Sequence, residues 1–497
     1  MVTSDIIVIG GGPAGVTAAL RARELGATVA LVERERMGGT CTNDGCVPTR
    51  VLAKAARLLR DSEQFADYGL EGSGRPVVNL PQLLARTKQI VEQVHEKKQL
   101  LSHLEEVGVT VRAGAGAARF VDPHTIAIGE GSAERMLRGQ KIVICAGGHA
   151  RRPPFPGSEF ALTYTAIWNL PRLPRSVVVV GGAATGCQLA SIMAAFGVPE
   201  VTLLDSASRI LPGEDVLISD IVTRGFRRHG VKVVTGIGGV SGIEKAGGDI
   251  PELLVRYKIS AHSDDEEILT TEAVVLAIGW PGNIEALDLD AAGVKTERGY
   301  VTVNDSLQTS TPHIFAAGDI TGRMMLVQSA GDEARTAAEN AVLGTDKQEF
   351  HTVVPHGGFT DPEYASVGLT EEKSRERESD AVSTIVPYAD LDRAVIDGRP
   401  EGACKLIVSR TTHQILGAHV AGEQALEVIE IIAAGMATEM KIEQLADLEL
   451  AYPTFTAIVG IAAREICREL GTVPVSPHWR AVRPPRAAEW EHSYFES

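Results

Sequence analysis

The sequence is short of cysteine and of positive charge. Its 497 residues include only six cysteines, too few and too scattered for the disulfide scaffold of a small secreted protein. Its 48 lysines and arginines are outnumbered by 64 aspartates and glutamates, which gives a net charge of −16. That balance argues against nucleic acid or an anionic membrane surface as the main partner. We therefore expect a protein of the reducing cytoplasm.

The sequence also lacks a targeting segment and an uninterrupted apolar run of membrane-spanning length. The first residues, MVTSDIIVIGGG, have no basic region and quickly become rich in glycine, so we predict no signal peptide. The most apolar stretch, from Val177 to Val198, contains a glycine cluster and Gln188. It fits a buried strand, turn and helix better than a membrane span.

An internal repeat is the main feature that the sequence does contain. The segments DIIVIG, GGPAGVTAALRARELG and ATVALVE predict a strand, a turn with a helix, and a second strand. SVVVVG, GAATGCQLASIMAAFG and EVTLLD repeat this pattern from Ser176. From about Phe350 the pattern changes to alternating strands with two apolar helices. We therefore predict an α/β fold with two Rossmann-like nucleotide-binding domains and a C-terminal α+β domain.

The first repeat carries a dinucleotide-binding motif. Gly10, Gly12 and Gly15 form G-x-G-x-x-G between the first strand and its helix. Such glycines permit a tight turn, a close approach of the backbone to a pyrophosphate, and packing of the helix on the strand. Glu33 ends the next strand, where its carboxylate can accept hydrogen bonds from ribose hydroxyls. The alternative is a glycine-rich turn made only for packing, but strand, helix and acid in register favour dinucleotide binding.

The second repeat carries a weaker copy of the motif. Gly181, Ala183 and Gly186 occupy its three positions, and Asp205 ends the following strand. Because alanine replaces the middle glycine, we expect the backbone and the phosphate to lie slightly further apart.

The acid of the second repeat bears on the choice of nicotinamide nucleotide. Asp205 would bond a ribose 2′-hydroxyl and repel a 2′-phosphate, which favours NADH over NADPH. Ser206, Ser208 and Arg209 lie close by in the sequence, however, and could hold a phosphate. Both nucleotides therefore stay open, with NADH slightly favoured.

Two cysteines, Cys41 and Cys46, lie four residues apart shortly after the first repeat. A glycine pair precedes them, and a helix with Pro48 in its first turn is predicted to follow. Thiols near a helix N-terminus have a lowered pKa, and the thiolate is the reactive form. A zinc site would need a second Cys or His pair near by, and none lies within thirty residues. A redox-active pair is the favoured interpretation, with a metal site or simple packing as alternatives.

These motifs resemble the glutathione reductase family of pyridine-nucleotide disulfide oxidoreductases, which includes dihydrolipoamide dehydrogenase and mercuric reductase. The resemblance rests on GGGPAG…E, GGTCxNxGCVPT, AxG…PPFPG, AAGD and FTDPEYASVGLT, and it covers about residues 5 to 470. It implies FAD in the first repeat, NAD(P)H in the second, and a homodimer whose active sites each use both chains. The implied domains are FAD-binding (1–150 with 284–348), NAD(P)-binding (151–283) and interface (349–470), followed by a tail (471–497).

The resemblance also implies roles for individual residues. The ADP part of FAD would be held by Gly10, Gly12, Gly15 and Glu33, and Gly279 would close the NAD(P) domain. Electrons would pass from the nicotinamide to the flavin and then to the disulfide, with Cys46 as the flavin-side thiolate and Cys41 as the interchange thiol. The residues that would line the path of the flavin are Gly39, Thr40, Ala118, Gly147 and Asp319.

Two positions depart from the family pattern beside the flavin. The family motif usually ends in a lysine that pairs with a glutamate of the second repeat, and these positions here are Arg50 and Gln188. Arginine keeps the positive charge but cannot lose its proton, and Gln188 removes the countercharge. We therefore expect a more positive flavin site, which favours the anionic reduced flavin.

A third departure lies in the segment that the partner chain would contribute. Disulfide-reducing relatives carry a His-Pro pair there with a glutamate shortly after it, whereas this chain has Tyr452, Pro453 and, in place of the glutamate, Ala457. Tyrosine, with a pKa near 10, is a poor proton shuttle at pH 7. Mercuric reductase also uses a tyrosine in this region, since a soft metal ion needs thiolate ligands more than a proton donor. Packing at the interface is the alternative role for Tyr452.

We therefore predict an FAD-dependent NAD(P)H oxidoreductase with a working Cys41–Cys46 disulfide. Its acceptor would be a small-molecule or protein disulfide, or another thiophilic group. Metal-ion reduction, a diaphorase or quinone reductase that works directly from the flavin, and a binding subunit without turnover remain as alternatives.

Overall fold

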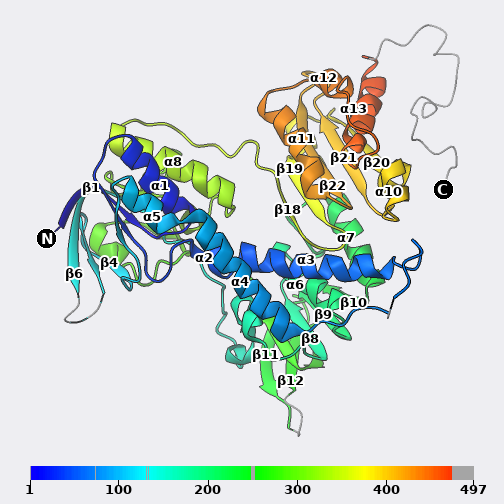
Figure 1. Ribbon diagram of the computed structural model, residues 1–497, viewed down its shortest axis with the longest axis horizontal. Coiled ribbons are helices and arrows are strands. Elements are labelled where there is room, and N and C mark those ends of the chain that lie inside the picture. Colours follow the sequence, from blue (N-terminus) through cyan, green and yellow to red (C-terminus); the bar gives the residue numbers. More distant parts are fainter. Residues whose placement is uncertain (1, 73, 130, 132–133, 248–251, 473–497) are drawn as a thin grey trace.

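The computed structural model describes residues 2–72, 74–129, 131, 134–247 and 252–472. Figure 1 shows three lobes: an N-terminal one in blue and cyan with a yellow-green helix against it, a lower green one, and a C-terminal one in orange. A long blue helix passes between the lower and the C-terminal lobes. The predicted fold class is confirmed. Most of the predicted tail, from residue 473, lies outside the described residues.

The N-terminal lobe is built on one sheet, whose strands are β1 (Val2–Ile9), β2 (Val29–Val32), β3 (Thr110–Arg112), β4 (Ala118–Asp122), β5 (Thr125–Ile128), β6 (Arg135–Ile144) and β17 (Ile314–Ala316). The order is β3-β2-β1-β6-β5-β4, and β17 pairs with β6. The pairs around β1 are parallel, and β4 and β5 are antiparallel. Successive residues Ile6 and Ile7 are both buried, as expected for a central strand covered on both faces.

Two alanine-rich helices cover one face of this sheet, α1 (Pro13–Glu24) and α8 (Val327–Leu343). Their small side chains, among them Ala18 and Ala337, are buried in one core with β1. Because β17 and α8 follow the middle lobe in the sequence, the chain leaves the first sheet and later returns to it. This return supports the proposed assignment of 284–348 to the first domain, whose boundaries stay a prediction.

The lower lobe repeats the same design. Its parallel sheet has the order β10-β9-β8-β14-β7, and three further strands form an antiparallel sheet. The segment from Val177 to Val198 forms the predicted strand, turn and helix, and no helix in the described part of the chain is long and apolar enough to cross a membrane. The elements are β7 (Leu162–Thr163), β8 (Ser176–Val180), α6 (Ala184–Ala195), β9 (Glu200–Asp205), α7 (Val216–Arg228), β10 (Val231–Thr235), β11 (Gly239–Lys245), β12 (Leu253–Lys258), β13 (Glu266–Thr271) and β14 (Ala273–Leu276).

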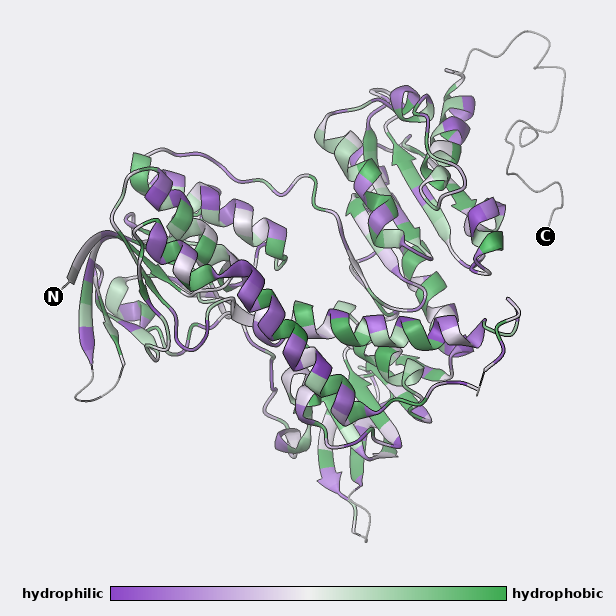
Figure 2. Ribbon diagram, viewed as in Figure 1, coloured by the Kyte–Doolittle hydropathy of each residue, from purple (hydrophilic) through white to green (hydrophobic). Residues whose placement is uncertain are grey.

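Helices of the cysteine segment connect the lobes: α2 (Gly39–Asn43), α3 (Cys46–Glu63), α4 (Leu80–Lys98) and α5 (Leu100–Glu106). Leu52 and Leu59 of α3 pack against Leu84 of α4 and Phe196 at the end of α6. Figure 2 shows much of α4 in purple, whereas the strands beneath the helices are largely green. Helix α3 is therefore held by apolar contacts on the side of the lower lobe.

The C-terminal lobe is an antiparallel sheet with helices against it. The order is β18-β19-β22-β21-β20. The elements are β18 (His356–Gly358), β19 (Tyr364–Gly368), α9 (Glu371–Arg377), β20 (Val382–Pro387), η6 (Tyr388–Asp390), α10 (Asp392–Ile396), β21 (Ala403–Val408), β22 (Ile415–Ala421), α11 (Ala425–Ala437), α12 (Ile442–Ala446) and α13 (Ala457–Leu470). Ile429 of α11 and Ile461 of α13 are buried in its core.

A buried ion pair joins the lower and the C-terminal lobes. The Nζ atom of Lys405, on β21, lies 2.7 Å from Oδ1 of Asp215 and 2.8 Å from Oε2 of Glu371. Asp215 precedes α7 and accepts hydrogen bonds from the backbone N–H groups of Leu217 and Glu371, both at 3.0 Å. Lys405 and Asp215 are 5% and 3% exposed. Lys405 of the C-terminal sheet thus neutralises the negative charge of Asp215 in the second nucleotide-binding repeat.

Four of the six cysteines are core residues. Cys145, Cys187, Cys404 and Cys467 are buried. Burial raises the pKa of each of these thiols, which keeps them protonated and unreactive. These four thiols are therefore core residues, and the reactive chemistry is left to Cys41 and Cys46.

Candidate active site

The first glycine motif is held by close backbone contacts. A Cβ atom on Gly10 would lie 2.2 Å from the carbonyl oxygen of Cys145, and one on Gly15 would lie 1.8 Å from the carbonyl oxygen of Gly10. Gly10 also has a positive φ of 110°, which side chains rarely adopt. A Cβ on Gly39 would lie 2.8 Å from the Cα of Gly12. The motif therefore packs directly against the start of the cysteine segment.

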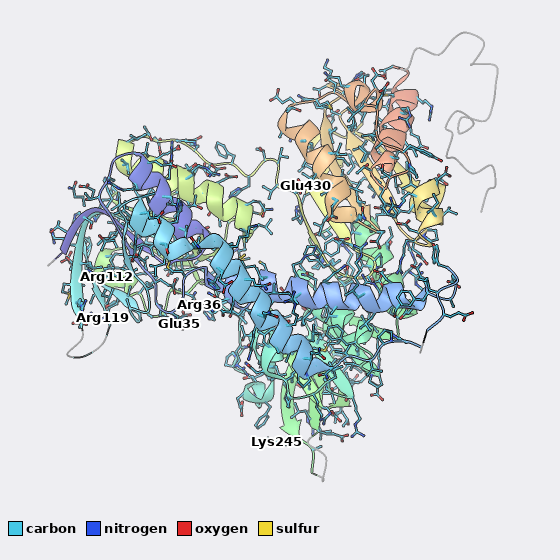
Figure 3. All side chains as sticks on the ribbon, in the orientation of Figure 1. Glu35, Arg36, Arg112, Arg119, Lys245 and Glu430 are labelled. Carbon is cyan, nitrogen blue, oxygen red and sulfur yellow. The ribbon has the colours of Figure 1, made fainter. Side chains whose placement is uncertain are left out.

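Glu33 holds this turn from the end of β2. Its Oε2 accepts the N–H of Gly11 at 2.7 Å, and its Oε1 accepts the N–H of Glu35 at 2.9 Å. The next residue, Arg36, labelled in Figure 3 near α4, donates to a carboxylate oxygen of Glu92 at 2.8 Å. The carboxylate of Glu33 keeps further lone pairs for ribose hydroxyls.

Ala118 lies deeper than the nucleotide turn. Its side chain is buried in the core cluster around β4. The backbone N–H of Ala115 instead donates to the carbonyl oxygen of Glu33, and that of Gly116 donates to the carbonyl oxygen of Arg34, both at 3.1 Å. Ala115 and Gly116 thus flank the end of β2, a placement that sequence reasoning missed. The flavin-lining role of Ala118 stays a prediction.

The second glycine motif matches the first in geometry. A Cβ on Gly181 would lie 2.3 Å from the carbonyl oxygen of Ala277, and one on Gly186 would lie 1.8 Å from that of Gly181. Asp205 accepts the N–H of Gly182, as Glu33 accepts that of Gly11. Ala183 is exposed at the start of α6, so its methyl group meets no packing obstacle. The helix has neither a side-chain cap nor an acidic residue in its first turn, which leaves its N–H groups free for a phosphate.

Arg209 is committed to the backbone. Its guanidinium donates to the carbonyl oxygens of Leu211 and Pro212 at 3.0 Å and of Glu214 at 2.8 Å. The side chain therefore closes its own loop instead of extending toward the end of β9. Asp205 uses its second oxygen to accept the N–H of Ala207 at 2.6 Å.

The segment of the redox cysteines is clamped from two sides. On one side, His95 bonds the side chain of Asn43 at 2.8 Å, and Lys98 donates to the hydroxyl of Thr42 at 3.1 Å. On the other side, the indole N–H of Trp168 donates to the carbonyl oxygen of Asp44 at 2.8 Å. The loop between α2 and α3 is thereby tied both to α4 and to the lower lobe.

Cys41 and Cys46 lie within hydrogen-bond reach of each other, and both are free thiols. The hydrogen bond from Cys46 and the charge of Lys98 lower the pKa of Cys41 to about 7. The same contact, together with burial, raises the pKa of Cys46 above its ordinary value. These residues alone thus favour a thiolate on Cys41, whereas the family resemblance assigns the flavin-stabilised thiolate to Cys46. That assignment stays a prediction.

Asp319 lies at the start of η5 (Asp319–Thr321), where its charge raises the pKa of both cysteines. Burial raises the pKa of Asp319 itself, although the indole N–H of Trp280 donates to its Oδ2 at 2.8 Å. Trp280 also packs against Tyr164, with ring centroids 5.4 Å apart. Tyr164 in turn bonds the side chains of Thr40 and Asp44. Two aromatic residues thus connect Asp319 to the cysteine segment.

The two remaining glycines lie where the chain passes between the lobes. Gly147 has a φ of 68° and accepts the N–H of Asn283 at 3.0 Å. Gly279 has a φ of 126° and accepts the N–H of Arg151 at 3.1 Å. Both glycines therefore occupy conformations that side chains rarely adopt, at the start and the end of the predicted NAD(P)-binding segment.

Arg50 and Gln188 meet around a residue that sequence reasoning missed. The guanidinium carbon of Arg50 lies 3.0 Å from the centroid of the Phe359 ring. The backbone N–H of Phe359 donates to Oε1 of Gln188 at 3.3 Å. The long separation of these residues in the sequence leaves no local signal for the contact.

Tyr452 lies between α12 and α13, and it is 60% exposed. Its hydroxyl donates to Oδ2 of Asp392 at 2.5 Å. The side chain is therefore oriented by a carboxylate on the surface of the C-terminal lobe. A role in the partner's active site stays a prediction.

The residues present fit a bound FAD. The glycine turn leads into α1, which has no side-chain cap and no acid in its first turn, so its N–H groups can meet a pyrophosphate. Glu33, at the end of β2, keeps lone pairs for ribose hydroxyls, and Asp319 is a half-buried carboxylate that accepts the indole N–H of Trp280. Within the described residues, no group of three or more His, Cys, Asp or Glu side chains is placed to hold a metal ion.

Comparison with known families agrees with this geometry. Residues 4–334 match the family model described as pyridine nucleotide-disulphide oxidoreductase. Residues 354–463 match the model of the dimerisation domain of the same family.

Individual relatives cover nearly the whole chain. A dihydrolipoyl dehydrogenase of Bacillus subtilis is 30% identical over 475 residues, which cover 92% of this chain and 97% of that protein. A glutathione reductase of a Nostoc species is 32% identical, covering 86% and 92%. A mercuric reductase of Lysinibacillus sphaericus is 30% identical, covering 92% and 82%.

A solved structure has the same fold along its full length. It is the Cu(II) complex of the HOCl-induced flavoprotein disulfide reductase RclA from Escherichia coli. The TM-score is 0.81 at 27% identity, and the alignment covers 94% of this chain and all of that one.

Proposed function

Because the chain belongs to the pyridine nucleotide-disulphide oxidoreductase family, we propose that it passes electrons from NADH through FAD and the Cys41–Cys46 pair to a thiophilic acceptor. The observation that carries this proposal is the contact between the sulfur of Cys41, on α2, and that of Cys46, at the start of α3. They lie beside Asp319 and the glycine turn that fits FAD. Bound FAD would supply hydride acceptance from the nicotinamide and electron transfer to the disulfide.

The chain's own residues prepare the thiols for exchange. The Cys46 thiol donates its hydrogen bond to Cys41, and Lys98 adds a positive charge, so a large fraction of Cys41 is thiolate at neutral pH. A thiol with a pKa near the ambient pH is the best attacking group in thiol–disulfide exchange. The clamps on Asn43 and Asp44 hold both sulfurs in register.

NADH is the nucleotide that the second repeat favours. Asp205 places a carboxylate where the ribose 2′-hydroxyl would lie, and it stays fixed by two backbone N–H groups. Arg209, the nearest arginine in the sequence, is bonded to three carbonyl oxygens. A 2′-phosphate would therefore meet a negative charge without a free guanidinium beside it.

A soft metal ion is the second candidate acceptor, and Tyr452 favours it. The hydroxyl of Tyr452 donates to a carboxylate oxygen of Asp392, and a phenol is a poorer proton shuttle for disulfide exchange than the histidine that disulfide-reducing relatives carry. Cu(II) is bound in the RclA structure, and mercuric reductases are among the relatives. Thiolates are soft ligands, which suit a soft ion such as Hg(II) or Cu(I).

The dimerisation domain supports assembly as a homodimer, in which Tyr452 of one chain would face the thiols of the other. The exposure of Tyr452 in the single chain agrees with this placement.

Anaerobic titration with NADH tests the central proposal. We expect a long-wavelength absorbance band after two electrons, because one thiolate of the reduced pair would lie against the flavin. The band should disappear in Cys46→Ser, the variant that removes the flavin-side thiol. Reduction of the flavin without that band in the wild-type protein would contradict the thiol relay.

Turnover of Cys41→Ser separates the acceptors. Oxidation of NADH that depends on Cu(II), Hg(II) or a disulfide should be lost in Cys41→Ser, since the interchange thiol is gone. Two results together would favour a diaphorase. The first is a quinone activity that survives in Cys41→Ser at the wild-type rate, and the second is the lack of any thiol-dependent activity in the wild type.

A further inference from the structure

Gln188 does not act on Arg50 through charge, although it lies close to it. Its Oε1 accepts the N–H of Phe359 at 3.3 Å, and its Nε2 donates to the carbonyl oxygen of Ala184 at 3.1 Å. Both ends of the amide are thus used to hold backbone. The cation of Arg50 needs its countercharge from elsewhere.

A cavity of about 550 Å³ beside α3 holds the candidates. Arg50 lines it together with acidic side chains from the C-terminal lobe. Three of these acids are already used by other arginines, because Arg57 pairs with Glu423, Arg228 pairs with Glu401, and Arg60 pairs with Asp361 at 3.1 Å. The described residues place no carboxylate in direct ion-pair contact with Arg50.

Two carboxylates of the cavity remain for Arg50: Glu363, just before β19, and Glu427, on α11. Both stabilise its positive charge through space. Glu427 is exposed, and water screens it. Glu363 is half-buried, so its field at the exposed side chain of Arg50 is screened less than that of Glu427.

We propose that Glu363 is the countercharge of Arg50, and that it thereby controls how strongly this cation favours reduction of the neighbouring flavin. Arg50 follows Cys46 by four residues on α3, so the two side chains lie on one helix face. Glu363 acts through Arg50 and is a positioning residue. The inference rests on the proposed function in one respect only, that FAD binds beside Cys46.

The countercharge changes with pH in the physiological range. Burial and the neighbouring Glu427 and Glu423 raise the pKa of Glu363 to about 7, against the opposing effect of Arg50 and Arg57. The buried hydroxyl of Tyr388 also faces Glu363, and its raised pKa keeps it neutral. The same cavity is lined by Lys54, His229 and Arg399, of which His229 pairs with Asp361. Above pH 7 Glu363 is charged and offsets Arg50. Below pH 7 it is neutral, and the full charge of Arg50 stabilises the electron-rich flavin.

The test is the potential of bound flavin, measured against a two-electron reference dye at pH 6 and pH 8. The Cys41→Ser background removes the disulfide, so the flavin alone takes the electrons. At pH 8, Glu363→Gln should favour the reduced flavin about tenfold, equivalent to about 30 mV. At pH 6 the potentials with and without Glu363→Gln should coincide, because the carboxyl is already protonated.

Two further variants complete the experiment. Glu401→Gln is the matched control, since Glu401 lines the same cavity but pairs with Arg228, and the potential should not move. Glu363→Asp keeps the charge, so the change in flavin potential between pH 6 and pH 8 should be the same as in the parent. This variant tests the proposal even if Glu363→Gln folds poorly. Equal potentials of Glu363→Gln and its parent at pH 8, or a shift of the same size at both pH values, would overturn the inference. Loss of the thiol relay alone would contradict the proposed function and leave the potential shift intact.

Discussion

Single side chains are predicted to decide which nicotinamide nucleotide and which thiol state the protein uses. Asp205 and Glu33 do the same structural work, since each accepts an N–H of its glycine turn. They differ in what surrounds them. Arg209, close to Asp205, is held by backbone carbonyls, so the second site has a fixed carboxylate and no free cation from that residue.

The nucleotide preference is predicted to follow the charge of Asp205. Asp205→Asn keeps an acceptor for the N–H groups but removes the charge that repels a 2′-phosphate. We expect the ratio of kcat/KM for NADH over NADPH to fall by about 10-fold to 100-fold, since hydrogen bonds to charged groups contribute about 1.5–3 kcal/mol. Arg209→Met should leave the ratio unchanged. A selective loss of NADPH use in Arg209→Met would show that the arginine binds phosphate.

Lys98 is predicted to keep Cys41 reactive. Lys98→Met should raise the pKa of Cys41 from about 7, because a positive charge that favours the thiolate is lost. Exposed charge pairs contribute about 0.2–1 kcal/mol, so the rise should be below about one unit. The pH dependence of alkylation of the reduced protein measures it, with Lys97→Met as the control. An unchanged profile would assign the lowered pKa to the contact with Cys46 alone.

At the scale of elements, α3 brings the chemistry of all three lobes together. Its first residue is Cys46, its fifth is Arg50, and its apolar side packs on α6 through Leu52 and Leu59. The opposite side faces the cavity that contains Glu363. A change in any lobe that tilts this helix would therefore reach Cys46 and Arg50 at once.

The sequence predicts the local features of the site, but it does not predict contacts between residues that lie far apart in the chain. The glycine motifs were readable because a Cβ atom at Gly10 or Gly181 would collide with a neighbouring carbonyl. The spacing of the cysteines also follows from local geometry. The contact of Arg50 with Phe359 joins segments far apart in the sequence. The spacing of apolar residues along the chain cannot predict such a contact.

The countercharge of Arg50 illustrates the same limit. The sequence has Gln188 where the family pattern has a glutamate, and this difference predicts a more positive flavin site. That Glu363 lies in the same cavity depends on how the C-terminal sheet docks against α3. Trp280 beside Asp319 is a further contact of this kind, since the two residues meet only where the second lobe returns to the first.

At the scale of the whole molecule, the buried Lys405–Asp215 pair joins two lobes, and its removal should be costly. Lys405→Met leaves two carboxylates without their cation, and breaking a buried ion pair in this way costs about 3–5 kcal/mol. Unfolding by urea, followed by fluorescence, measures the loss. Arg375→Met, which removes an exposed partner of Glu371, should change stability by less than about 1 kcal/mol. Equal, small effects of both variants would show that the buried pair is not a structural link.

The same ion pair has a consequence for how the molecule opens. Since Asp215 starts α7 and Lys405 lies in a central strand of the C-terminal sheet, neither lobe can loosen locally without exposing an unpaired charge. Amide hydrogens of α7 and β21 should therefore exchange with solvent as one cooperative unit. The N-terminal lobe, which lies outside this link, is free to exchange at a rate of its own.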